Sequence, residues 1–144
     1  MCYYKNIIKK VEKLKRVPTK YVRDVIKKNY RKKSSCYICN KKSNLELHHM
    51  YSLSELFHTW LEKNNLDKDD VNVIRTSRYN FMVDHKEELD DRNCLTLCKA
   101  HHERLHNIYG QTYSNSMVPK IKNWVKIQKE KYYESVARRQ TMDK

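Results

Sequence analysis

The sequence predicts a mainly helical α+β protein, in which a small core of two short strands and one helix is flanked by basic helices. Apolar residues recur at helical spacing near both ends of the 144-residue chain. Two short runs in the middle, LELHH and CLTL, have the length and alternation of strands. Pairs of cysteines and histidines stand beside both runs, so bound metal is expected to hold this small core together.

The first arm, residues 1–33, is predicted to hold two basic helices. Apolar residues at helical spacing predict a first helix over 4–14, which ends before Pro18. A second helix is predicted over about 19–30, with Thr19 as its N-cap and lysines and arginines on its remaining faces.

The centre of the chain, residues 34–110, is predicted to be a core with an insertion at about 52–92. The first strand covers 45–49 and the second covers 94–97. A helix follows over 99–108 and ends near Gly110, the only glycine in the sequence. Strand, insertion, strand and helix is therefore the expected order.

The insertion and the last arm are each predicted to carry a helix. Ser52 and Glu55 form a capping-box pattern at the start of an amphipathic run. Residues 66–92 are acidic and weakly periodic, and at most a short helix is expected there. Residues 111–144 are predicted to form a long basic helix that starts after Pro119.

The composition bounds what the chain can be. Its length suits one domain, and a hydrophobic content of 39% with a mean hydropathy of -0.98 allows only a modest core. No apolar run approaches the roughly 18 residues that span a bilayer, and the first ten residues lack the apolar core of a secretion signal. We therefore expect a cytoplasmic protein that contacts no membrane. In such a reducing compartment, cysteines spaced two apart more often bind metal than form a disulfide.

Positive charge is concentrated at the two ends of the chain, whose net charge is +14. Residues 1–33 hold 13 Lys and Arg against 2 Asp and Glu, residues 34–106 hold 10 against 12, and residues 107–144 hold 8 against 3. Basic arms on both sides of a nearly neutral centre suit a partner such as DNA, whose phosphates they would neutralise. A merely solvated surface or an AT-rich coding bias is the alternative explanation.

Two pairs of metal-ligating side chains predict a structural zinc site. Cys36 and Cys39 stand two residues apart on a predicted turn, and Cys98 and His101 stand at the start of the later helix. Sulfur and imidazole ligands favour tetrahedral zinc, and four protein ligands leave no open position for catalysis. The alternative is that the cysteines are buried apolar residues and that His101 is incidental.

Four more histidines form a second candidate set. His102 and His106 lie four residues apart and share one face of the later helix, where two imidazoles can bind one ion. His101 is turned by about 100° from His102, which lets these neighbours serve separate metals. In a strand His48 and His49 point to opposite sides, so only one of them can bind the same ion directly.

With these residues the chain resembles the zinc-containing HNH endonucleases, whose active site is a ββα-metal, treble-clef-like finger. The resemblance lies in three motifs, CYIC, LELHHM and NCLTLCKAHHERLH, within residues 36–106. It implies a catalytic metal bound by three histidines, a fourth histidine as the general base and an asparagine that orients this base. In that order, these residues are His48, His102, His106, His49 and Asn93.

The resemblance implies a DNA endonuclease, often phage-encoded, that hydrolyses phosphodiester bonds with one divalent metal ion. Magnesium and manganese are the expected catalytic ions, with zinc and nickel as alternatives. The enzyme would act in the host cytoplasm on DNA bound by the arms at 1–33 and 111–144, as a monomer or a dimer. One active site cuts one strand at a time, so a nick and a double-strand break both stay open.

Other interpretations of the same residues stay open as well. Asp84-His85 could be the catalytic pair, although two-residue matches often arise by chance. The zinc scaffold and the basic helices could form a nucleic-acid-binding module without catalysis, but such a module has no need of the second histidine set. A nuclease directed to RNA or to branched DNA is a further alternative, as is metal storage by all seven histidines.

Overall fold

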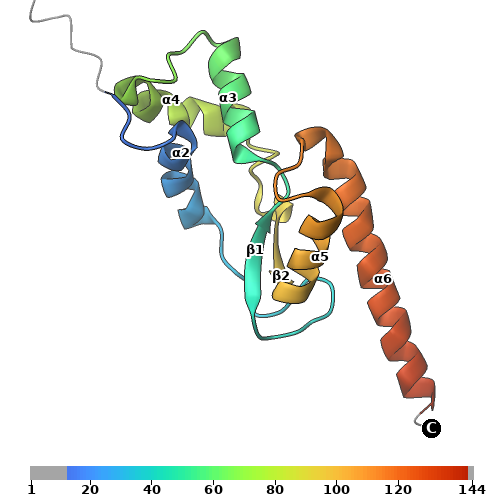
Figure 1. The fold of residues 1–144 in the computed structure, drawn as a ribbon. Coiled ribbons are helices and arrows are strands. Elements are labelled where there is room, and N and C mark those ends of the chain that lie inside the picture. The colour runs from blue at the N-terminus through green and yellow to red at the C-terminus, as the bar shows by residue number, and fades with distance from the viewer. Residues whose placement is uncertain (1–12, 143–144) are drawn as a thin grey trace, which may run out of the picture. The chain divides into compact units, whose positions relative to one another are not determined.

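The computed structural model describes residues 13–142, which form an α+β fold dominated by helices (Figure 1). Contacts along the chain divide it into two compact units. The described part of the first unit is residues 13–28 and Leu53–Lys86, and that of the second is Asn29–Ser52 and residues 87–142. No helix in this part of the chain is long and apolar enough to cross a membrane.

The first unit is built from three helices. These are α2 (Pro18–Ile26), α3 (Leu53–Lys63) and α4 (Val71–Asp84). Helix α2 contacts both of the others. A short 3-10 turn, η1 (Lys27–Asn29), follows α2. The core of the first unit is aromatic, since the rings of Phe57 and Phe81 meet edge to face at 4.9 Å between centroids. Such ring pairs add stabilisation beyond the area they bury.

The start of α2 differs from the prediction. Thr19 is not the N-cap, because the helix begins at Pro18 with Val17 as the cap residue. Proline suits the first helical position, where no backbone N–H is needed. Thr19 is instead buried in the first turn. Most of the predicted helix over 4–14 lies outside the described residues, and its described end is not helical, since Lys13 forms an isolated bridge with Asp70.

The insertion is more ordered than its weak periodicity predicts. Helix α4 has 14 residues where at most a short helix was expected. Its buried face includes Ser77, whose hydroxyl donates to the carbonyl of Val73, so a polar residue interrupts the apolar pattern. Asp70 caps the helix by accepting the N–H of Asn72. Residues 13–28 of the first arm and Leu53–Lys86 of the insertion, predicted as separate segments, therefore form one compact unit.

The second unit contains a two-stranded antiparallel sheet. Strand β1 (Leu45–His49) pairs with β2 (Cys94–Cys98), as the two alternating runs predict. His48 lies opposite Leu95 and His49 opposite Cys94, so the two histidines face opposite sides of the sheet.

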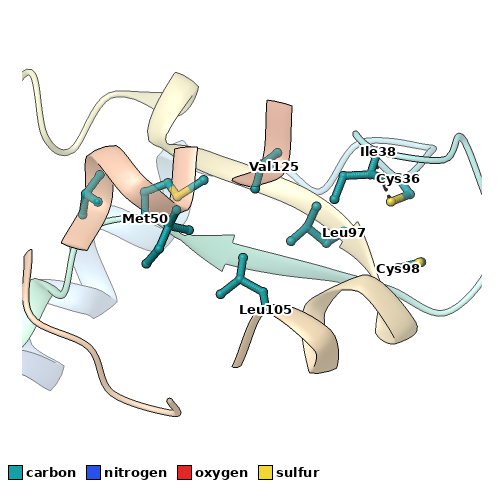
Figure 2. Packing of buried hydrophobic residues seen from close by; sticks show 9 residues of the cluster. Cys36, Ile38, Met50, Leu97, Cys98, Leu105 and Val125 are labelled. Atoms are coloured by element: carbon teal, nitrogen blue, oxygen red, sulfur yellow. Dashed lines mark hydrogen bonds between the residues drawn. The ribbon is translucent and has the colours of Figure 1, made fainter. Parts of the chain in front are cut away.

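Two helices complete the second unit. Helix α5 (Lys99–Tyr109) follows β2 directly and contacts both strands, and the 25-residue α6 (Val118–Met142) follows the short turn η3 (Asn115–Met117). A further 3-10 turn, η2 (Asp91–Asn93), leads into β2. Leu97 of β2 packs with residues of both helices in one buried cluster (Figure 2). The labelled members are Cys36, Ile38, Met50, Leu97, Cys98, Leu105 and Val125.

Candidate metal centres

A tight turn brings the first two cysteines together. The N–H of Asn40 donates to the carbonyl of Cys36 at 3.0 Å, and the N–H of Cys36 donates to the carbonyl of Lys41 at 2.8 Å. Asn40 has a positive φ of 58°, which asparagine tolerates better than most residues. The turn is fixed to β2 because the N–H of Tyr37 donates to the carbonyl of Thr96.

The other two ligands come from the start of α5. Cys98 is the N-cap residue of this helix, and His101 lies in its first turn. The Cys98 sulfur lies 3.8 Å from the Cys39 sulfur and 3.2 Å from Nδ1 of His101. Ligand atoms of Cys36, Cys39, Cys98 and His101 all lie within 4.8 Å of one another. The structure thus brings the four predicted zinc ligands into one cluster.

The chemistry of this cluster fits a zinc ion. Zinc–sulfur bonds of about 2.3 Å at tetrahedral angles place two sulfurs roughly 3.8 Å apart, as Cys39 and Cys98 are. Burial would raise the pKa of the Cys36 thiol, but N–H groups of the surrounding backbone outweigh it and lower that pKa. Burial and the neighbouring sulfurs raise the pKa of Cys39 to about 11. Several thiolates at such distances need a cation to offset their charge, and a bound divalent ion supplies it.

The second cluster joins β1 to α5. His48 is 3% exposed, and its Nδ1 lies 3.2 Å from Nε2 of His102. Nε2 of His106, one helical turn after His102, lies 3.0 Å from Nε2 of His102. Imidazole ligands of one ion stand roughly 3 Å apart when metal–nitrogen bonds are about 2.0–2.1 Å. The three side chains are therefore placed to hold one metal ion.

Each of these histidines has a partner for its outward nitrogen. Nδ1 of His102 lies 3.4 Å from a carboxylate oxygen of Glu46, and Nδ1 of His106 lies 2.9 Å from the carbonyl of Gly110. Nε2 of His48 lies 2.9 Å from the hydroxyl of Tyr113. The Glu46 carboxylate and the Gly110 carbonyl can only accept, so Nδ1 of His102 and of His106 donates and Nε2 of both rings keeps its lone pair. Two such lone pairs beside Nδ1 of His48 are suited to a cation.

Ionisation of the cluster agrees with this arrangement. Burial, together with the neighbouring imidazoles of His102, His106 and His49, lowers the pKa of His48 to about 3. His48 is therefore neutral at pH 7, as a metal ligand must be. Burial raises the pKa of Tyr113 to about 12, so its hydroxyl keeps its proton over the same range.

His49 ends β1 directly after His48, and Asn93 directly precedes β2. His49 occupies the opposite face of β1 from His48, and its ring centroid lies 5.2 Å from that of Tyr30. Asn93 accepts the N–H of Met50 through its carbonyl at 2.8 Å and donates through its side chain to the carbonyl of Glu87 at 2.9 Å. Asn93 thereby ties the chain that leaves β1 to the chain that enters β2.

The competing pair Asp84-His85 belongs to the first unit. Asp84 accepts the indole N–H of Trp60 at 2.8 Å, and the His85 ring lies 5.1 Å from that of Phe81. Neither residue is a member of the two groups that could hold a metal ion among the described residues. The pair supports the aromatic core of the first unit.

Two residues that contact the histidine cluster were not predicted from the sequence. Glu46 stands two positions before His48, so strand alternation alone puts both side chains on one face and could have identified it. Tyr113 is one of 11 tyrosines and lies in the loop after α5, where no periodicity marks it.

An α+β fold with two groups of cysteines and histidines, each able to hold an ion, defines a small basic protein with two candidate metal centres. The chain belongs to the nicking endonuclease family, because the model of this phage T5 nicking endonuclease family matches residues 8–141. It is therefore an endonuclease that acts on DNA. No solved structure matches the chain significantly.

Proposed function

We propose that the chain is a one-metal HNH nuclease that nicks duplex DNA. His48, His102 and His106 would bind the catalytic ion, and His49 would be the general base. The observation that carries this proposal is the convergence of three ring nitrogens, 3.0 and 3.2 Å apart, from histidines whose outward nitrogens each have a hydrogen-bond partner. Membership of a nicking endonuclease family supports cleavage of one strand.

The side chains of this centre have separate roles in the proposed reaction. A divalent ion, magnesium or manganese in the first place and zinc or nickel as alternatives, supplies positive charge where the phosphate and the leaving 3′ oxygen become more negative. His49 lies on the other face of β1 from His48 and takes a proton from the attacking water. Asn93 holds the end of the strand that carries His49, through its bond to Met50. The expected products carry 5′ phosphate and 3′ hydroxyl ends.

Cys36, Cys39, Cys98 and His101 would bind a structural zinc ion. Four protein ligands leave it no open position, so it takes no part in cleavage. The ion would join the turn before β1 to the junction of β2 and α5, because its ligands come from both places. We place the nuclease core at 34–110, with basic arms for DNA at 1–33 and 111–144.

Cleavage of supercoiled plasmid by the purified protein tests this function. We expect magnesium or manganese to convert the plasmid to nicked circles before any linear form appears, and EDTA to abolish the conversion. Single-stranded RNA and branched DNA, offered in parallel, are expected to be cut more slowly than duplex DNA. Salt-sensitive binding without cleavage, under every metal and on every substrate, would reject the enzyme in favour of a zinc-stabilised binding module.

DNA binding is expected to weaken steeply with salt, because the basic arms displace counterions from the phosphates. Each phosphate contact contributes a slope of about -0.9 in a plot of log affinity against log salt concentration. Replacement of Lys120, Lys122 and Lys126, all exposed on α6, by glutamine should therefore reduce the slope by up to roughly 3. Fluorescence anisotropy with a labelled duplex at salt concentrations between about 50 and 200 mM measures this slope.

A matched triple variant controls for the change in net charge. Lys63→Gln, Lys68→Gln and Lys86→Gln remove three positive charges from the nearly neutral centre of the chain. This variant should keep a slope close to that of the unsubstituted protein. Equal slopes for both triple variants would show that the C-terminal arm does not contact DNA.

A further inference from the structure

The loop that follows α5 contacts the histidine cluster at several points. The Tyr113 hydroxyl lies 2.9 Å from Nε2 of His48, 2.7 Å from the carbonyl oxygen of Met50 and 3.2 Å from that of His49. The loop thus contacts both a candidate metal ligand and the backbone where β1 ends.

A phenol has one proton to donate, which decides the direction of these hydrogen bonds. Backbone carbonyls only accept, so the Tyr113 proton is directed to them, and the contact with the Met50 oxygen is the shortest. The Tyr113 oxygen then accepts the proton on Nε2 of His48. Nδ1 of His48 is consequently the nitrogen without a proton, and it faces Nε2 of His102.

We infer that Tyr113 is a positioning residue of the catalytic metal centre, which fixes His48 in the Nε2–H tautomer and so selects Nδ1 as its ligand atom. The inference rests on the proposed function, because it requires His48 to bind an ion. Partners of this kind on metal-binding histidines typically change metal affinity by 10–100-fold when removed.

The rest of the loop is built to hold Tyr113 in place. Asn115 accepts the N–H of Ser52 at 2.6 Å and donates to its carbonyl at 3.3 Å, which joins the loop to the chain after β1. At the other end Gly110 accepts Nδ1–H of His106 at 2.9 Å and donates its own N–H to the His106 carbonyl at 2.8 Å. Gly110 has a φ of 93°, a conformation that favours glycine. One loop thus supplies the outward partners of two of the three histidines.

Tyr113→Phe removes the hydroxyl and keeps the ring, so it tests this role with little change in packing. Calorimetric titration of manganese or nickel into protein that holds zinc only at its cysteine cluster measures the affinity of the histidine cluster. We expect Tyr113→Phe to weaken it by about 10–100-fold while one zinc ion per chain is retained. Tyr132→Phe, on α6, removes a tyrosine hydroxyl at another place and should leave the affinity unchanged.

The tautomer of the neutral His48 ring can be measured without any variant. Long-range proton–nitrogen NMR spectra of the metal-free histidine cluster distinguish the two tautomers, and we expect Nε2–H in the unsubstituted protein. A predominant Nδ1–H tautomer, or a Tyr113→Phe variant with unchanged metal affinity, would overturn the inference. His48→Ala separates this failure from that of the proposed function: if it too binds metal with unchanged affinity, the metal centre itself is refuted.

Discussion

Replacement of His49 by alanine is expected to slow plasmid nicking by about 10²–10⁴-fold, the range typical of a lost general base. Its side chain occupies the face of β1 opposite His48. Loss of the imidazole should therefore remove proton transfer without removing a metal ligand. Single-turnover cleavage of a labelled duplex measures the chemical step directly, and metal analysis of the same sample shows whether both ions are retained.

A second histidine provides the control for this variant. His58 lies on α3 in the first unit and belongs to neither candidate metal centre. His58→Ala should cleave at the unsubstituted rate. Cleavage by His49→Ala within a factor of a few of that rate, with its metals in place, would show that the attacking water loses its proton to another group.

The gathering of side chains in the two candidate metal centres was predictable because much of their geometry is local. A spacing of two residues places Cys36 and Cys39 on one turn, and a spacing of four places His102 and His106 on one helical face. Strand alternation separates His48 from His49. What joins these local pairs is the register of β1 against β2 and the direct entry of β2 into α5.

Other features depend on contacts that spacing does not encode. The insertion shares a core with α2 because this helix packs on α3 and α4, elements far from it in the sequence. Ser77 is a polar residue on the buried face of α4, so the apolar residues of this helix do not show a clear helical spacing in the sequence. Its burial is possible because its hydroxyl donates to the carbonyl of Val73 in the same helix. Tyr113 reaches His48 across 65 positions from an irregular loop. Residues that support a site from outside are thus harder to predict than its ligands.

Cys36→Ser is expected to release the structural zinc and to unfold the core of the second unit. Cys36 and Cys98 belong to the buried cluster around Leu97, so loss of the ion removes a link inside the core. A two-stranded sheet is only marginally stable by itself. Binding of structural zinc is worth about 10–16 kcal/mol in zinc-finger peptides, comparable with the 5–15 kcal/mol that stabilises a whole domain. Zinc content by elemental analysis and urea unfolding followed by circular dichroism measure both effects.

Cys94→Ala separates loss of the ion from loss of a buried cysteine. Cys94 is 7% exposed, stands opposite His49 in the sheet and lies outside the cysteine cluster. Burial raises the pKa of its thiol to about 11, so it remains an uncharged core side chain at pH 7. This variant should keep one zinc ion per chain and a cooperative unfolding transition. If Cys36→Ser also kept its zinc and its urea midpoint, apolar packing would hold the second unit together and the cysteine cluster would not be structural.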